Sequence, residues 1–323
     1  MNVARPSERG GQERNCPLCG NGPREARWTK GTLRVVACAG CGMLFASPVE
    51  EELASGAFYD RLAVPFYLSP DKLAGDYAAV RFQRELKCFR KACPRGEVLD
   101  VGCSTGAFLH QLQERFPGDY RVTGTDVASP ALDHAASRGV AVIRDSFLTH
   151  DFGEQRFDAI TFWAVMEHLV EPSAFLSRAT SLLRPGGMIY VLVPNAGSLA
   201  ARLLGARYRY VMPDHVNYFS TATLRRFIAL QPTLEIVKVG STHFNPIVIW
   251  QDLRRRDERV PDAERAHLLK RTTAWKQNPI LTPARWIYHG VESLLGALGL
   301  ADNLIVVAQK ADAGQPSGKR AGA

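Results

Sequence analysis

The chain has 323 residues, of which 46% are apolar, so it is long enough for one large domain with attachments or for two domains. Its formal net charge is +8, which raises the question of nucleic-acid binding. The basic residues are spread over both ends and a late helical region rather than gathered in one block, so a solvated basic surface explains the excess. The purest apolar runs have only strand length and the start is polar, so we expect a cytoplasmic protein without membrane contact.

Two cysteine pairs mark the first part of the chain. We expect the polar residues 1–14 to be disordered. Residues 15–48 follow with the matched motifs "CPLCG" and "CAGCG", whose cysteines are Cys16, Cys19, Cys38 and Cys41. Four thiolates at this spacing form a closed tetrahedral zinc site with no position for water, so the zinc would be structural. So short a segment cannot bury enough apolar surface to fold alone, and the metal would supply the missing free energy.

An alternation of short apolar runs and amphipathic segments begins near residue 95, after a stretch at 49–94 that we interpret as a helical linker or cap. Val- and Leu-rich runs predict five strands, at residues 97–103, 121–127, 140–145, 157–165 and 188–195. Periodicity and capping residues predict helices between them, at residues 105–116, 129–139 and 171–183. Strands that alternate with helices favour parallel pairing and therefore a doubly wound α/β sheet.

The domain that begins at residue 95 is predicted to run to residue 310. After a loop come a helix at 221–230, a strand at 234–240, a helical insertion at 243–302 and a last strand at 303–310. The tail, residues 311–323, is small and polar, and we expect it to be disordered.

The turn between the first strand and the first helix, "EVLDVGCSTGAFL", is the expected ligand site, because open parallel sheets bind ligands beyond the carboxyl ends of their strands. Gly102 and Gly106 keep side chains away from the backbone there. Their spacing lacks the Gly-Lys-Ser/Thr of a triphosphate site and fits the G-x-G-x-x-G of a dinucleotide site poorly. S-adenosylmethionine is the third candidate: its ammonium would compensate the costly charge of Asp100 within the strand. Asp126, which ends the second strand, can accept both ribose hydroxyls, although NAD enzymes share that acid.

Four segments in order resemble class I S-adenosylmethionine-dependent methyltransferases: "VLDVGCSTGAFL", "TGTDVA", "FDAITFWAVMEHLVEP" and "LLRPGGMIYVLVPN". The resemblance covers roughly residues 95–242 and the last strand. It implies a seven-stranded, mostly parallel sheet whose final strand lies antiparallel beside the fifth. Four-cysteine N-terminal segments of this type resemble those of methyltransferases that act on sugars or other small metabolites, and also those of ribosomal RNA methyltransferases.

The resemblance also implies positions around the cofactor. Those expected at the methionine end are Asp100, Gly102, Cys103 and Gly106. Those expected at the ribose and adenine are Asp126, Val127, Asp145 and Ser146. Trp163 would face the cofactor pocket, with core packing as the alternative.

The acceptor side offers two catalytic candidates. Direct displacement from a sulfonium needs a general base only for a hydroxyl or carbon acid. The segment "FWAVMEHL" lacks the prolines that follow this strand in enzymes that methylate base amines. His168 lies in an "EH" pair common in small-molecule O-methyltransferases of the ubiquinone-pathway type and is a candidate base, with a loop-capping histidine as the alternative. His215, in "PDHVNYFS", is predicted to line the acceptor pocket.

These features predict a cytoplasmic S-adenosylmethionine-dependent methyltransferase with a structural zinc ribbon, acting on an oxygen or carbon of a small metabolite. Arg207 and Arg209 alternate with tyrosines, and a solvent-facing loop or contact with an anionic acceptor would both explain them. Two other functions stay open: an RNA methyltransferase whose ribbon grips RNA, and a cofactor-fold protein that binds a partner without catalysis. A homodimer formed through the helical insertion is a further alternative.

Overall fold

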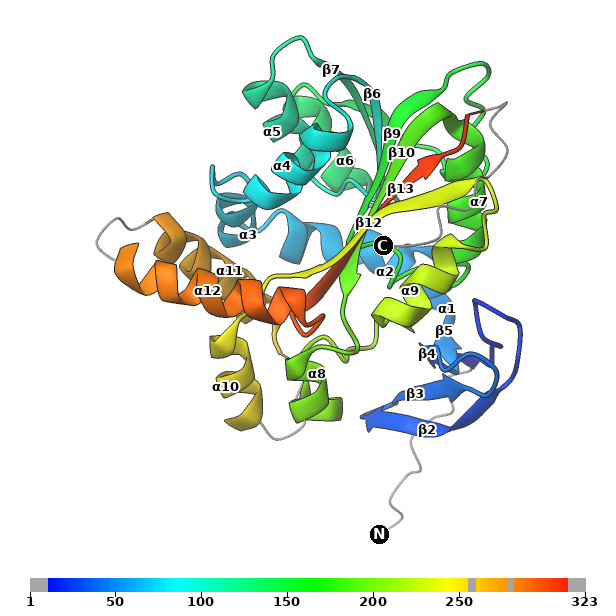
Figure 1. Ribbon diagram of the computed structural model, residues 1–323, viewed down its shortest axis with the longest axis vertical. Coiled ribbons are helices and arrows are strands. Elements are labelled where there is room, and N and C mark those ends of the chain that lie inside the picture. Colours follow the sequence, from blue (N-terminus) through cyan, green and yellow to red (C-terminus); the bar gives the residue numbers. More distant parts are fainter. Residues whose placement is uncertain (1–10, 255–259, 278–281, 313–323) are drawn as a thin grey trace, which may run out of the picture.

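The computed structural model describes residues 11–254, 260–277 and 282–312. Its centre is a seven-stranded sheet with the order β12-β13-β10-β9-β6-β7-β8 (Figure 1). The strands are β6 (Gly96–Val101), β7 (Tyr120–Thr125), β8 (Ala141–Ile143), β9 (Phe157–Trp163), β10 (Leu183–Pro194), β12 (Leu234–Thr242) and β13 (Asn303–Lys310). β13 pairs antiparallel with β10 and with β12, whereas the pairs among β6 to β10 are parallel. The predicted seven-stranded sheet with an antiparallel final strand is therefore confirmed.

Helices cover both faces of this sheet, as the alternating apolar pattern requires. One face packs on a core that includes Leu176 of α7 (Pro172–Leu182) and Phe227 of α9 (Thr221–Ile228). The other packs on a core that includes Phe89 of α4 (Gln83–Ala92), Phe108 of α5 (Ala107–Arg115) and Leu132 of α6 (Ser129–Ser137). Both layers bury apolar side chains against the strands, and this burial is the main stabilising contribution of the fold.

Strand β10 begins earlier than the sequence predicts. The motif "RPGG" is expected to end a helix and precede the strand, but α7 ends at Leu182 and β10 starts at Leu183. The register between β10 and β9 shifts between Leu183 and Met188, and Gly186 has a φ of 76°. The glycines thus let an irregular bulge join the strand instead of interrupting it.

The ribbon at the N-terminus is a second sheet that includes a strand from the large domain. Its order is β11-β4-β3-β2, with β2 (Pro23–Lys30), β3 (Leu33–Cys38), β4 (Leu44–Ala46) and β11 (Asn217–Tyr218). β11 pairs antiparallel with β4. The ribbon is therefore continuous, through backbone hydrogen bonds, with the segment that carries His215.

Part of the segment predicted to be disordered is ordered. β1 (Gly11–Gln12) pairs antiparallel with β5 (Val49–Glu50), and the backbone N–H of Arg14 donates to Ser47 Oγ at 3.1 Å. A polar sequence cannot form its own core, but here a neighbouring strand satisfies its backbone groups. Residues 1–10 lie outside the described part of the chain, as do residues 313–323 of the tail.

Two groups of helical segments, one before the first strand of the seven-stranded sheet and one before its last strand, meet where α11 packs against α3 (Figure 1). The first group is α1 (Glu51–Ser55), α2 (Ala57–Leu62), a π-helical turn (Ala63–Tyr67) and α3 (Pro70–Asp76). The second is the predicted insertion before the last strand: α10 (Pro246–Arg254), α11 (Asp262–Gln277) and α12 (Thr282–Ala297). α11 packs against α3, and α10 packs against α8 (Leu199–Leu204). Within the described ranges, we find no helix with the length and apolar character needed to cross a membrane.

Candidate active site and cysteine cluster

The turn after β6 has a backbone that favours glycine. Gly102 and Gly106 have φ values of 74° and 73°. A Cβ on Gly102 would lie 2.5 Å from Val165 Cγ2, and one on Gly106 would lie 2.8 Å from Ala135 Cβ. Both glycines are thus required by packing within the protein itself. They also bring the turn against Val165, in the loop that leads to His168.

Asp126 ties this turn to the next helix. One carboxylate oxygen accepts the backbone N–H of Ser104 at 2.8 Å, and the other accepts that of Ala128 at 2.9 Å. Each oxygen keeps a further lone pair with which it can accept a hydroxyl. The predicted ribose acid therefore lies at the carboxyl end of β7, held in a fixed orientation.

Asp100 is buried in β6, where the Thr161 hydroxyl is its side-chain partner. Its residue is 2% exposed, and Oδ1 accepts the Thr161 hydroxyl at 2.6 Å. Burial raises the pKa of Asp100 to about 7; the Thr161 hydrogen bond lowers it, and the Asp126 charge raises it further. A buried carboxylate on the edge of ionisation suits a cationic ligand group, because a cation would restore its charged form.

Two of the other predicted cofactor residues pack their side chains against the core. Cys103 is 7% exposed and packs in the core cluster of α5, where its Sγ would lie 2.6 Å from a Cβ on Gly124. Only its backbone is left for a ligand. The Trp163 ring packs against Phe108 at 4.9 Å and Tyr190 at 6.2 Å between centroids. This is the core-packing alternative, and it arises because the last residue of β9 points to the α5 face of the sheet.

The remaining predicted positions lie at the surface rim of the same edge. Val127 is 54% exposed. Asp145 and Ser146 are exposed after β8, and Asp145 Oδ2 lies 2.9 Å from His150 Nδ1. The Thr125 hydroxyl donates to the Asp145 backbone oxygen at 3.5 Å, which brings this loop beside the end of β7.

The turn between α1 and α2 extends over this rim, which the sequence did not indicate. A Cβ on Gly56 would lie 3.3 Å from Val127 Cβ, and Asp60 accepts the backbone N–H of Ser129 at 3.1 Å. On the same helix, Tyr59 donates its hydroxyl to the Asp214 backbone oxygen at 3.3 Å. α2 therefore bridges the rim at Val127 and the segment that precedes His215.

Five titratable groups meet around His168 and His215. His168 and His215 have ring centroids 4.6 Å apart, and the Tyr59 ring meets His168 edge-on at 5.4 Å. His168 Nδ1 lies 2.8 Å from the Asp214 backbone oxygen and 3.9 Å from Asp214 Oδ2. Because a carbonyl only accepts, Nδ1 carries the proton and Nε2 holds the free lone pair. Nε2 lies 4.0 Å from Glu167 Oε1.

Burial favours the uncharged forms of Glu167, His168 and His215. It raises the pKa of Glu167 to about 8, with the Asp214 charge adding to the rise. It lowers the pKa of His168, against the opposing effect of Asp214, and it lowers the pKa of His215 well below its usual value, helped by His168. Neutral imidazoles at neutral pH are able to accept a proton.

The sequence alone does not mark Glu167 or Tyr59 as site residues. Glu167 stands next to His168 in a short loop, and nothing in the local sequence indicates that its side chain is buried. Tyr59 is distant from the histidines in the sequence. It reaches them only because of the way α2 packs, which the sequence does not reveal. Loop residues that converge from distant segments have no local periodicity to mark them.

The predicted pair of arginines does not act as a pair. Arg207 is exposed at the end of a 3-10 turn (Gly205–Arg207), whereas Arg209 is buried and forms a bidentate ion pair with Asp252. The two contacts with Asp252 Oδ1 are 3.0 Å and 2.7 Å. An extended loop would have placed both side chains on one side, but the turn rotates them apart. Arg209 fastens α10 to the loop and is not available to an acceptor.

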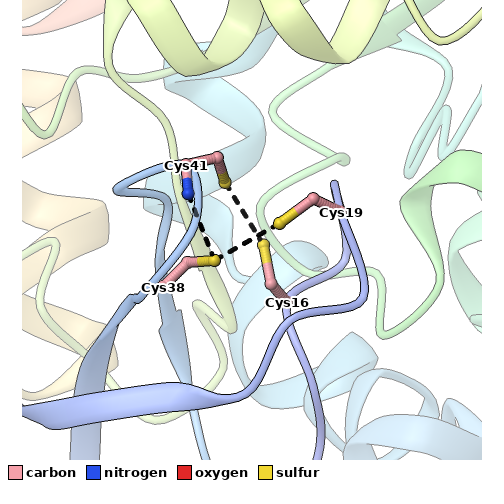
Figure 2. A group of neighbouring side chains, drawn as sticks. All are labelled: Cys16, Cys19, Cys38 and Cys41. Carbon is pink, nitrogen blue, oxygen red and sulfur yellow. Dashed lines mark hydrogen bonds between the residues drawn. The ribbon is translucent and has the colours of Figure 1, made fainter.

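The four cysteines of the ribbon converge on one point, with their sulfur atoms facing each other (Figure 2). Cys16 Sγ lies 3.5 Å from Cys41 Sγ, and Cys19 Sγ lies 3.4 Å from Cys38 Sγ, too far for disulfides. A zinc tetrahedron with bonds of about 2.3 Å has sulfur–sulfur edges of about 3.8 Å. Backbone N–H groups of Gly40 and Cys41 point to Cys38 Sγ. Burial acts to raise the pKa of Cys38, but these bonds and Cys19 lower it to about 7.

Comparisons with known proteins agree with this architecture. Residues 76–229 match a protein family described as "Methyltransferase domain". The ubiquinone biosynthesis O-methyltransferase of Serratia proteamaculans is 28% identical over 46% of this chain and 66% of its own length. That of Caulobacter vibrioides is 30% identical over 42% of this chain and 58% of its own length. The chain thus spans about two thirds or less of these two relatives.

Among solved structures, the [4+2]-cyclase SpnF superposes with a TM-score of 0.53 at 16% identity, covering 82% of this chain and 97% of the cyclase. That likeness concerns the fold alone. The sheet order and the acids near the ends of β6 and β7 agree with a ligand site at the carboxyl edge of a doubly wound α/β sheet. The chain is thus similar to a methyltransferase domain over residues 76–229, and the two relatives match it over a comparable share of its length.

Proposed function

We propose that the protein transfers a methyl group from S-adenosylmethionine to an oxygen or carbon of a small metabolite. The observation that carries this proposal is the Tyr59, Glu167, His168, Asp214 and His215 cluster beside the glycine turn. Val165 packs on Gly102, so the cluster begins only two residues from the expected cofactor site. The O-methyltransferase names of the two relatives support an oxygen acceptor.

The residues at the cofactor end fit the ligand that the class implies. Asp100 would pair with its ammonium, and the free lone pairs of Asp126 would accept the ribose hydroxyls. The cofactor supplies a methyl group already activated on a sulfonium. The protein's own task is then to align acceptor and methyl and to exclude water, which the α2 bridge over the rim supports.

His168 is the proposed general base, and His215 the proposed wall of the acceptor site. His168 Nε2 has a lone pair because Nδ1–H is held by the Asp214 carbonyl, and its side chain is 17% exposed, so an acceptor can reach it. The proton of the acceptor hydroxyl or carbon acid would pass to Nε2. His215 is 4% exposed and stacks beside Tyr210, with ring centroids 6.1 Å apart.

The cysteine cluster is proposed to hold one structural zinc ion. All four donors are thiols and converge at a spacing that suits a tetrahedron, so no ligand position is left for chemistry. This metal would stabilise the ribbon and, through the β4–β11 pairing, the segment next to His215.

The test is to incubate the purified zinc-loaded protein and methyl-labelled cofactor with a metabolite extract and, separately, with total RNA. Label in small molecules that disappears with His168→Asn supports the proposal. Label in RNA, or cofactor binding without any labelled product, would contradict it.

A further inference from the structure

We propose that Glu167, His168 and His215 form a second transition-metal site, distinct from the cysteine cluster, and that a cation bound there blocks methyl transfer. The binding site stands on the geometry alone. The inhibitory effect rests on the proposed function, in which the lone pair of His168 accepts the acceptor's proton.

Three potential metal donors meet in one buried place. One ligand atom from each of Glu167, His168 and His215 lies within 4.8 Å of the others. Metal bonds of about 2.1 Å place neighbouring ligand atoms about 3.3 Å apart, so small side-chain rotations would close the site. The donors come from two loops, after β9 and after β10, that are bound to each other: Val216 N–H and Asn217 N–H both donate to the Glu167 backbone oxygen, at 2.8 Å and 2.9 Å.

Unsatisfied oxygen atoms point to a missing cation. The Glu167 side chain is 1% exposed, and neither of its carboxylate oxygens has a hydrogen-bond partner. Asp214 Oδ1 is also buried without a partner. Buried polar atoms are nearly always paired, and a carboxylate in such a place is paired or coordinates a metal.

The orientation of His168 is the one that metal-binding histidines have. Ligating histidines donate their other ring N–H to a carbonyl or carboxylate, which fixes the tautomer and aims the free nitrogen at the metal. Here Nδ1–H donates to the Asp214 backbone oxygen at 2.8 Å, and Nε2 is directed to the side of Glu167. Two imidazoles and one carboxylate suit zinc, cobalt, nickel or ferrous iron rather than magnesium or calcium.

A cation at this position competes with catalysis for one electron pair. His168 Nε2 has a single lone pair, so it either accepts a proton or binds a metal. Occupancy of the site would therefore stop proton transfer from the acceptor while leaving the cofactor end, at Asp100 and Asp126, unchanged.

The test counts metal in the intact, zinc-loaded protein after equilibration with Co²⁺ and removal of free ions. Wild type is expected to hold two metal ions per chain, and both Glu167→Gln and His215→Asn to hold one, with at least a tenfold loss of affinity for the second ion. His267→Asn is the matched control, because it removes an exposed histidine that faces Asp71 and should leave the count at two.

Spectroscopy separates the two sites without any variant. A Co²⁺ ion in the cysteine cluster gives intense thiolate charge-transfer absorption, whereas Co²⁺ bound by two imidazoles and a carboxylate gives only weak d–d bands. The second ion is expected to add d–d bands alone. One ion per wild-type chain, or a second ion that persists in both variants, overturns the site. Circular dichroism and cofactor binding verify that the variants fold.

The inhibition has its own readout. Added Zn²⁺ should lower the methylation rate with a midpoint equal to the affinity of the second ion, and a weak chelator that spares the cysteine site should restore it. Activation by Zn²⁺, or inhibition at a concentration unrelated to binding, overturns the competition. Failure to find any acceptor would count against the proposed function, and the metal count does not depend on it.

Discussion

If Asp100 pairs with the cofactor's ammonium as proposed, cofactor binding should depend on pH. Burial raises the pKa of this carboxyl to about 7 in the free protein, so it is largely protonated below that pH. The ammonium of the bound cofactor favours the ionised form, so binding should release a proton. Affinity for S-adenosylmethionine is then expected to increase by about tenfold per pH unit as the pH rises toward 7 and to level off above it. Calorimetry in two buffers with different ionisation enthalpies measures the released proton.

The control is Asp100→Asn, which should bind the cofactor more weakly and show little pH dependence. Affinity that does not change with pH in the wild type, with no proton released, would show that Asp100 does not face the ammonium.

His168 and His215 should differ in what their replacement does. Because His168 holds the free lone pair, His168→Asn is expected to lower kcat by about 10²–10⁴-fold with little change in the KM of the cofactor. His215→Asn should mainly raise the KM of the acceptor. Steady-state kinetics with both substrates varied separates the two effects. An exposed histidine, His267, serves as the control position, and an equal loss in His267→Asn would refute the assignment.

Asn217 positions the loop that carries Glu167 and His168. Its amide donates to the backbone oxygens of Met166 at 2.8 Å and Leu169 at 2.7 Å, and its oxygen accepts from Arg14 at 2.8 Å. Asn217→Asp would aim a carboxylate at two carbonyls and is expected to destabilise the fold by about 1–3 kcal/mol. It should also lower kcat at a temperature where the variant is fully folded, as measured by thermal unfolding and kinetics.

Asn195→Asp is the matched control for that prediction. The Asn195 amide donates to Gly299 and Ala301 oxygens, both at 2.9 Å, and so clamps a loop in the same way but before β13. The Asn195→Asp variant should lose about as much stability as Asn217→Asp but keep the wild-type kcat. If both variants lose kcat alike, Asn217 has only a structural role.

At the scale of elements, the sequence predicts individual strands and helices but not the contacts between segments that are far apart in the chain. The parallel strands and their helices were predictable, because hydrophobic periodicity is written in neighbouring residues. The pairing of β11 with β4 joins residue 217 to residue 45, and no local pattern encodes it. The α2 bridge from Asp60 to Ser129 was missed for the same reason. The expectation that Arg207 and Arg209 lie on the same side of an extended loop is wrong, because Arg207 ends a 3-10 turn.

The shared ribbon sheet predicts that metal in the cysteine cluster stabilises the acceptor side. Since β4 pairs with β11, removal of zinc should loosen the segment after His215. Hydrogen exchange is expected to speed up in residues 214–219 on chelation and to stay unchanged in β7, which pairs with strands of the large sheet and with none of the ribbon sheet. Faster exchange in both segments would indicate general unfolding, and no change in either would show that the ribbon is independent.

At the scale of the whole molecule, the fold class was predictable because four motifs in order define one chain path. The strand order follows from that path, with β13 inserted between β10 and β12. Only part of the cluster around His168 and His215 can be predicted from the sequence. Both histidines were named from the sequence, but their carboxylate partners acquire meaning only through burial. Burial is a property of the folded chain as a whole and cannot be assigned to a single loop residue.

The distribution of charge over the molecule predicts that RNA binds weakly and that its affinity depends little on salt concentration. Many arginines are engaged by neighbouring acids, in pairs such as Arg90 with Asp119, Arg144 with Asp133 and Arg209 with Asp252. In the part of the chain that the structure describes, such local pairs weaken the positive field that a phosphate backbone would meet. Proteins that make six or more phosphate contacts lose about 10³-fold or more in affinity between low and moderate salt.

For this protein we expect the affinity for RNA to fall by less than about tenfold between low and moderate salt. That loss corresponds to about two phosphate contacts or fewer. Fluorescence anisotropy with a labelled single-stranded RNA, repeated at increasing salt on the zinc-loaded protein, measures the slope. A steep slope that Arg27→Ala or Lys30→Ala in β2 makes shallower would instead assign RNA binding to the ribbon. It would also favour the RNA methyltransferase over the small-molecule enzyme, because a ribbon sheet joined to the His215 segment would then deliver a nucleic-acid acceptor to the same cluster.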